Sequence, residues 1–304
     1  MALRCIGSMA GHELDPTTLQ RVRRLALASR RRVSALLSGE FRSQFRGTGI
    51  EFETVREYVP GDDVRALDWN VTARLSRPYV KLFVESRERP AWLVVDRSAS
   101  MAFGSDERTK ADVAAELAGV LALAAMHDRD ATGIITFKAG IDAVLTPSCR
   151  ADQLERILLA LHAGESEGGG EFRDAFDVLE RRLLRRSVLV LISDFHAPHD
   201  SARLARLARR HDVIACIVFD PRERELAGDG LVACVDPETG RRFMLDAADA
   251  RERAEYAALA RAEHERRLEL LRGCGAEPLE VSTQHDVVER LLAHFGARSR
   301  GGAR

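Results

Sequence analysis

From residue 91 onward, short apolar segments alternate with amphipathic ones, and this alternation constrains the fold more than any other feature. Residues 92–95, 188–192 and 213–219 have the length and continuous hydrophobicity of buried strands. Residues 111–127 and 201–210 repeat apolar side chains at helical spacing. Buried strands that alternate with helices form parallel sheets covered on both faces. The sequence therefore predicts a mostly parallel, doubly wound α/β sheet of the Rossmann type.

This α/β domain is expected to span residues 89–296, with further elements between and after the main strands. The tail at 297–304 is rich in Arg, Gly and Ser and is expected to be disordered. The further elements that the pattern predicts are a hairpin of 133–137 and 141–145, helices at 152–162 and 173–184, an inserted hairpin within 230–246, a charged helix at 249–272, a strand at 279–281 and a helix at 287–295.

Residues 1–88 have a different character, and we expect them to pack on the main domain rather than to fold alone. A helix is predicted at 16–38, because Asp15 can act as its N-cap and Pro16 suits its first turn. A small β-rich segment follows at 40–88, with alternating or aromatic runs at 50–55 and 79–84.

The first 50 residues hold nine Arg against three acidic residues, a local excess of positive charge. We interpret it first as the solvated face of an amphipathic helix. A patch for an acidic partner or for lipid headgroups is the alternative, and it would make the chain a peripheral membrane protein.

Bulk properties exclude several classes of protein. The net charge of −1 gives no basic excess of the kind that nucleic-acid binding requires. The five Cys are scattered without a C-x-x-C pair, which argues against a disulfide framework or a zinc site and favours a reducing, cytoplasmic location. The longest apolar stretch, at 117–126, has about half the length that a membrane-spanning helix needs. No transmembrane segment is therefore expected.

Oxygen-bearing side chains follow two of the predicted strands. Asp96, Ser98 and Ser100 alternate after the first strand, and Asp194 follows the strand at 188–192. Ligands of open α/β sheets bind at the carboxyl ends of the strands, so both loops should open on one edge. Carboxylates and hydroxyls form a hard, all-oxygen set that suits Mg²⁺ or Mn²⁺. The sequence therefore predicts a metal site made of Asp96, Ser98, Ser100 and Asp194.

Other polar residues near these loops have two interpretations each. His196 and His199 could add imidazole ligands, but we favour loop residues ahead of a helix capped by Asp200. Asp62 and Asp63 lie in a Pro-Gly-Asp-Asp turn, where they could bind a ligand or cap backbone amides.

Two motifs resemble known families. The Asp96-x-Ser98-x-Ser100 loop resembles the metal-ion-dependent adhesion site (MIDAS) of von Willebrand factor A domains. A longer motif resembles the bacterial family known as domain of unknown function 58, and with the metal loops the resemblance covers about residues 15–220. The residues of that motif are Arg56, Tyr58, Pro60, Gly61, Asp62, Asp63, Arg65, Asp68, Trp69, Thr72, Ala73, Arg74, Val80 and Lys81.

The resemblance implies a von Willebrand A-like fold, a bound Mg²⁺ and association with a MoxR-type AAA+ ATPase. The family usually has a Thr ligand in its Gly-Gly-Thr-Asp-Leu loop, where this chain has Gly170. Because Gly has no side-chain oxygen, the ion should be held more weakly, through water, or by Glu171.

The resemblance thus favours a chaperone-like cytoplasmic adaptor, not an enzyme, that docks the ATPase and an unknown client protein through the metal. The alternative is a metal-dependent hydrolase or phosphotransferase with Asp96 as nucleophile. Three absences argue against it: no second Asp at position 98, no evident general base, and no Lys close by in the sequence to bind phosphate.

Overall fold

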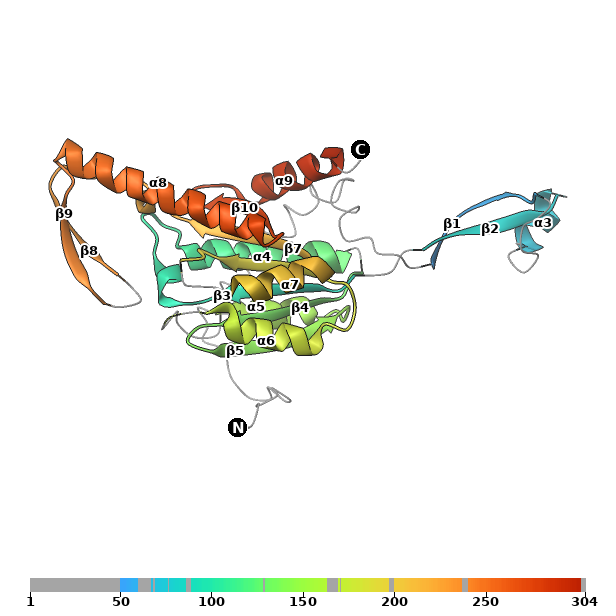
Figure 1. Cartoon of the computed structure of the whole chain (residues 1–304). Helices are drawn as coiled ribbons and strands as arrows, with labels where there is room; N and C mark the ends of the chain where they lie inside the picture. The colour runs from blue at the N-terminus through green and yellow to red at the C-terminus, as the bar shows by residue number, and fades with distance from the viewer. Residues whose placement is uncertain are drawn as a thin grey trace. The chain divides into compact units, whose positions relative to one another are not determined.

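The computed structural model describes residues 50–59, 67, 69–75, 77–85, 89–127, 129–162, 169, 171–196, 200–236 and 240–301. The chain divides into two compact units, one within Phe45–Arg89 and one that contains the described residues from Pro90 onward (Figure 1). The helix predicted at 16–38 and the Pro-Gly-Asp-Asp turn lie outside the described residues.

A single six-stranded sheet forms the centre of the larger unit. Its strands lie in the order β10-β7-β6-β3-β4-β5. All neighbours are parallel except β5, which runs antiparallel to β4 at the edge. The predicted doubly wound sheet is therefore confirmed, and the three main strands of the prediction, β3, β6 and β7, are parallel neighbours in it. The strands are β3 (Ala91–Asp96), β4 (Thr132–Phe137), β5 (Ile141–Ser148), β6 (Val188–Ser193), β7 (Asp212–Phe219) and β10 (Glu277–Ser282).

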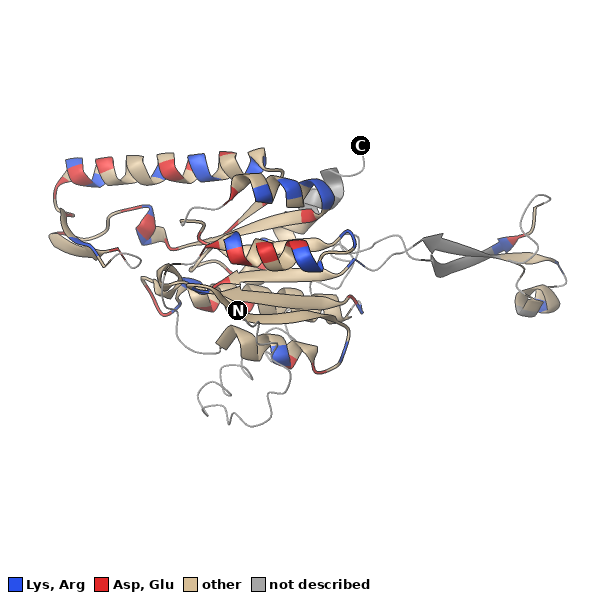
Figure 2. Ribbon diagram, turned by 60° about the horizontal axis from the view of Figure 1, so that its bottom comes forward, with Lys and Arg blue, Asp and Glu red and all other residues tan. Residues whose placement is uncertain are grey.

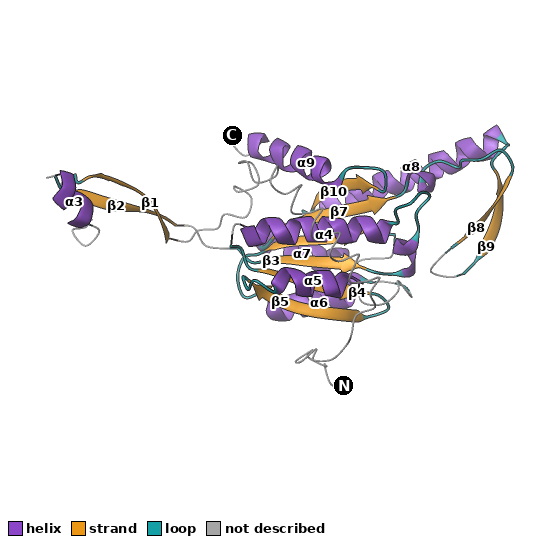
Figure 3. Cartoon of the chain, turned by 180° about the vertical axis from the view of Figure 1, so that it is seen from behind, coloured by secondary structure: helices purple, strands orange, loops and turns teal. Residues whose placement is uncertain are grey.

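Helices cover both faces of this sheet (Figures 1 and 3). One face carries α4 (Lys110–His127), α5 (Gln153–His162) and α9 (Val287–Gly301). The other carries α6 (Phe172–Arg182), α7 (Ser201–Arg210) and α8 (Ala250–Gly273). Every residue of β3, β4 and β6 is buried, which explains why β3 and β6 are continuously apolar up to their last residue instead of alternating.

Two features of the larger unit depart from the sequence prediction. Helix α9 runs to Gly301 and so includes the first residues of the tail that the sequence indicates to be disordered, because Ala and Arg continue a helix readily. Short 3₁₀ helices, η2 (Ala99–Ala102) and η3 (Pro221–Glu223), follow β3 and β7. They shape the loops at the carboxyl edge of the sheet.

A hairpin is inserted between β7 and α8. Its strands, β8 (Leu231–Val235) and β9 (Arg242–Asp246), form a separate two-stranded sheet, as predicted. Helix α8 carries charges of both signs along its length (Figure 2). Of the helices in the described part of the chain, none combines the length and the hydrophobicity that crossing a bilayer requires.

The smaller unit contains the two strands predicted near its ends. Strands β1 (Ile50–Glu57) and β2 (Tyr79–Glu85) pair antiparallel. The helix α3 (Trp69–Leu75) was not predicted, because its β-branched and aromatic residues are weak helix formers. The backbone amide of Tyr79 donates to the Thr72 hydroxyl at 3.0 Å, which ties α3 to β2. The packing of this segment on the main domain stays a prediction.

Candidate metal centre at the carboxyl edge of the sheet

The loop after β3 gathers three of the four predicted ligands. Asp96 is the last residue of β3, and its Oδ1 accepts the backbone amide of Ser98 at 2.8 Å. The hydroxyl oxygens of Ser98 and Ser100 lie 3.1 Å apart. All three side chains are at least nine-tenths buried. One carboxylate and two hydroxyls therefore lie together at the end of the central strand, as their alternation in the sequence predicts.

Ser193, rather than Asp194, joins this loop from the neighbouring strand. Its hydroxyl donates to Asp96 Oδ2 at 2.6 Å and accepts the backbone amide of Phe195 at 2.9 Å. This contact was not predicted from the sequence. Ser193 ends β6 and Asp194 follows it at once, so the sequence alone does not show which of the two faces Asp96.

Burial dominates the electrostatics of Asp96. Desolvation raises the pKa of its carboxyl from 3.8 to about 6, against the lowering effect of the hydrogen bonds from Ser193 and Ser98. The negative charge of Asp194 raises it further. Among the described residues, this carboxylate receives hydrogen bonds from the hydroxyls of Ser193 and Ser98 and from the backbone amide of Ser98, all of which are neutral. A cation at this place would offset the cost of the buried charge, so the donor set fits a divalent ion.

Asp194 is turned toward a lysine. Lys110, at the start of α4, donates from Nζ to Asp194 Oδ2 at 2.7 Å and to Glu223 Oε1 at 2.5 Å. Both Lys110 and Asp194 are almost fully buried. Burial alone would lower the pKa of Lys110, but the two carboxylates outweigh it and the pKa is raised. Burial would raise the pKa of Asp194, yet Lys110 and the hydrogen bond from the backbone amide of His196 hold it below its usual value.

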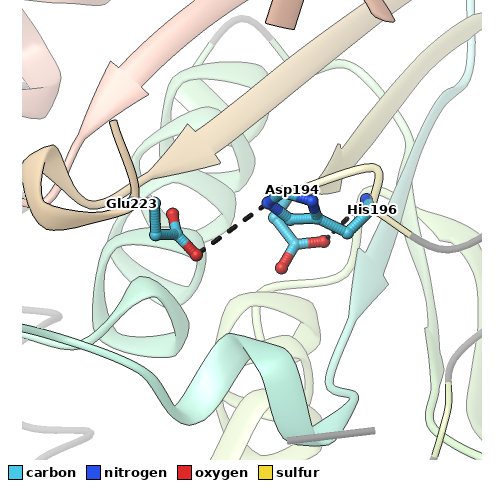
Figure 4. Close-up of side chains that lie close together, drawn as sticks. All are labelled: Asp194, His196 and Glu223. Atoms are coloured by element: carbon cyan, nitrogen blue, oxygen red, sulfur yellow. Dashed lines mark hydrogen bonds and ion pairs between the residues drawn. The ribbon is translucent and has the colours of Figure 1, made fainter. Parts of the chain in front are cut away.

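A second group of ligand-type side chains surrounds this lysine. Ligand atoms of Asp194, His196 and Glu223 all lie within 4.8 Å of one another, a spacing that could hold a metal ion (Figure 4). Two cationic side chains already form hydrogen bonds with these residues, however. Besides the Lys110 contacts, Arg267 donates to His196 Nδ1 at 3.0 Å and to the backbone carbonyl of Asp194 at 2.9 Å.

The arginine disfavours His196 as a ligand. With Nδ1 accepting from Arg267, the proton of a neutral His196 lies on Nε2, which then has no free lone pair for a metal. Burial lowers the pKa of His196, which keeps the ring neutral. The serine loop around Asp96, which has no such cation among its hydrogen-bond donors, is chemically the better metal site.

Besides Ser193, three residues of this edge were not predicted from the sequence. Glu223 had a local signal, since it completes a capping box with Asp220 at the start of η3. Lys110 had a weaker one, as the only charged residue pointing into the core at the start of a mostly apolar helix. Arg267 lies among many charged residues of α8, and nothing distinguishes it there.

Of the other residues singled out from the sequence, four cannot be placed, one is exposed and one is a helix cap. Gly170, His199, Asp62 and Asp63 lie outside the described residues. Glu171 is exposed, just before α6. Asp200 caps α7 by accepting the backbone amide of Arg203 at 3.0 Å, as predicted.

The sheet order and the Asp-x-Ser-x-Ser loop at its edge define a von Willebrand A-like α/β protein. The family profile described as "Protein of unknown function DUF58" matches residues 54–266, and the chain belongs to that family. It is 34% identical to the Mycobacterium tuberculosis protein described as uncharacterized protein Rv1480, over 94% of this chain and 92% of the relative.

Solved structures with similar folds are more distant. BatB from Bacteroides thetaiotaomicron, described as a conserved hypothetical protein, is 14% identical. The match has a TM-score of 0.45 and covers 70% of this chain and 99% of that one. The VWA domain of SpRpn10 is 11% identical with a TM-score of 0.37, and the match covers 68% of this chain and 94% of that domain.

Proposed function

We propose that this chain is a metal-dependent adaptor that docks a partner protein at the carboxyl edge of its sheet. The observation that carries the proposal is the buried Asp96 carboxylate, which lies beside two serine hydroxyls and receives hydrogen bonds from neutral donors. Mg²⁺ or Mn²⁺ is the cation that this all-oxygen set suits. Asp96, Ser98 and Ser100 would hold it, and a partner carboxylate would fill an open position.

Asp194 would act through water in this arrangement. Its Oδ2 accepts from Lys110 and its Oδ1 accepts the backbone amide of His196 at 3.1 Å. An oxygen that already serves an ammonium is a poor direct ligand for a second cation, whereas a metal-bound water can still donate to it. The fourth predicted ligand is therefore assigned to an outer position.

The partner that we propose is a MoxR-type AAA+ ATPase in the cytoplasm, with the adaptor linking that motor to a client. Support comes from the family resemblance and from the metal loop. We expect the ATPase to co-purify with the full chain from lysate in Mg²⁺, and to be lost with a chelator or with Asp96→Ala. Asp152→Ala is the control, since that exposed carboxylate lies in a different loop. Equal recovery in all four samples would refute a metal-dependent contact.

The alternative function is phosphoester chemistry at the same edge, with Asp96 as nucleophile. One argument made against it, the lack of a nearby lysine, does not hold in three dimensions, because Lys110 contacts Asp194, which lies 84 residues later in the chain. That ammonium is nonetheless 1% exposed and held by two carboxylates, so it is not free to bind phosphate. Turnover of a generic phosphoester that disappears with Asp96→Asn would favour this alternative over the adaptor.

A proton and a metal ion should compete for Asp96. Because the pKa of its carboxyl is raised to about 6, Mn²⁺ affinity should fall about tenfold per pH unit below pH 6 and level off above it. Titration calorimetry between pH 5 and 8 measures this. His196→Ala should keep the same slope, since the proposal gives that imidazole no role as a ligand. Equal affinity at pH 5 and pH 7 would show that Asp96 does not bind the ion.

A further inference from the structure

The hairpin between β7 and α8 has an exposed apolar face. Residues directly opposite in an antiparallel pair share a face, and three such pairs point the same way. Large apolar side chains on this face are open to solvent: Leu231 is 71% exposed, Met244 57% and Val235 53%. The pairs are Leu231 with Asp246, Ala233 with Met244, and Val235 with Arg242. We call these six residues the outer face of the hairpin.

The opposite face of the hairpin is partly covered. Val232, Cys234 and Leu245 on this face are partly buried, whereas Phe243 is 45% exposed. Strand β9 contacts the start of α8, from which the hairpin projects (Figures 1 and 3). The backbone amide of Asp246 donates to Glu252 of that helix at 2.7 Å. A two-stranded sheet is marginally stable alone, so the contact of β9 with α8 helps to hold the hairpin. It does not explain the solvent-exposed apolar side chains on the other side.

The charges at the ends of the outer face are complementary to each other. Along β9 the face reads Arg242, Met244, Asp246, which is a cation, an apolar centre and an anion. Arg242 and Met244 are exposed, whereas Asp246 is partly buried and its Oδ1 accepts the backbone amide of Ala248 at 2.9 Å. A two-fold axis in the plane of the face and perpendicular to the strands reverses the strand direction and stacks β9 on β9. Met244 then meets Met244 of the partner subunit, and Arg242 meets Asp246 of the partner subunit, twice.

Strand β8 is compatible with the same two-fold axis. Along β8 the face reads Leu231, Ala233, Val235, so Leu231 meets Val235 of the partner subunit around a central pair of small Ala233 side chains. A two-fold axis along the strands would instead place Arg242 and Asp246 over apolar residues. Self-complementarity of this kind is what an isologous dimer interface requires.

We propose that the outer face of the hairpin docks on the same face of a second copy of this chain, with the strands antiparallel across the two-fold axis. Two charge pairs set the register and the apolar centre is excluded from water. The face is small compared with standard interfaces, so the dimer is weak, with a Kd in the micromolar range or above. This inference is independent of the metal site.

Charge reversal tests the register. The full chain is followed by sedimentation equilibrium over a wide concentration range. R242D places a carboxylate opposite Asp246 of the partner subunit, and D246R places two guanidinium groups together. Each variant alone should self-associate at least tenfold more weakly. An equimolar mixture should recover the dimer, because each subunit then meets the opposite charge at both ends. R242D/D246R should also dimerise by itself.

Two further variants separate the proposal from misfolding. Arg241→Asp makes the same charge change one residue earlier, outside β9, and should leave self-association unchanged. Met244→Glu keeps the charge pairs but puts like charges at the centre, and should abolish the dimer. Circular dichroism checks that every variant is folded. A monomeric natural chain at all concentrations, or folded variants whose mixture fails to recover the dimer, would overturn the proposal.

Discussion

Lys110→Met is expected to lower the free energy of unfolding by about 3–5 kcal/mol when no divalent cation is present. The ammonium of Lys110 is 1% exposed and bridges Asp194 and Glu223 at 2.7 and 2.5 Å. Methionine fills a similar volume, so packing changes little and the loss is electrostatic. Without the lysine, the buried Asp194 carboxylate keeps its charge but loses its cation. Urea unfolding in the presence of a chelator measures the effect.

The matched control for this experiment is Lys138→Met. Lys138 lies at the β4–β5 turn and is partly exposed, so removing its charge should change stability by no more than about 0.5 kcal/mol. Excess Mg²⁺ or Mn²⁺ should restore part of the stability of Lys110→Met, because the freed Asp194 becomes available to the ion. A loss below about 1 kcal/mol would mean that Asp194 and Glu223 protonate or find water without cost, and that the lysine is not their necessary counter-ion.

Lys110 also shows which contacts could not be predicted from the sequence. The main strands were predictable because each is a continuous apolar run, and the Asp96–Ser100 loop was predictable because its residues are neighbours in the chain. Lys110 lies 84 residues from Asp194 and 113 from Glu223, so no local pattern joins them. Strand order decides that contact, and it places the loops after β6 and β7 against the start of α4.

The choice between Ser193 and Asp194 was unpredictable for a different reason. Successive side chains at a strand end point to opposite sides, so a shift of one residue exchanges their roles. The sequence indicates that a polar pair reaches the metal loop, and the register of β6 with β3 determines that the hydroxyl contacts Asp96 while the carboxylate turns to Lys110. The predicted set of four oxygens is thus divided between two adjacent clusters.

Asp96→Asn is expected to stabilise the metal-free protein at pH 7.5 by up to about 3 kcal/mol, although it removes the central ligand of the proposed site. The pKa of Asp96 is raised from 3.8 to about 6, chiefly by burial, and the difference converts to about that energy. The unfolded chain releases this proton at lower pH than the folded chain. Stability therefore falls as pH rises from about 4 to 6, and the full cost is present above pH 6. Asparagine keeps the oxygen that accepts from Ser98 and carries no charge.

Asp220→Asn is the control variant, because we expect it to change the stability in the opposite direction. Asp220 also has almost no exposed surface, but hydrogen bonds from Ser105, Arg222 and Thr283 outweigh burial and hold its pKa below the usual value. Removing that charge should therefore destabilise the fold at the same pH. Urea unfolding in chelator at pH 5 and 7.5 compares the two variants, and addition of Mg²⁺ should stabilise the natural chain but not Asp96→Asn. If both asparagine variants were less stable than the natural chain at pH 7.5, the charge of Asp96 would stabilise the fold without a metal ion. That result would contradict the idea that Asp96 is a buried ligand that needs a cation.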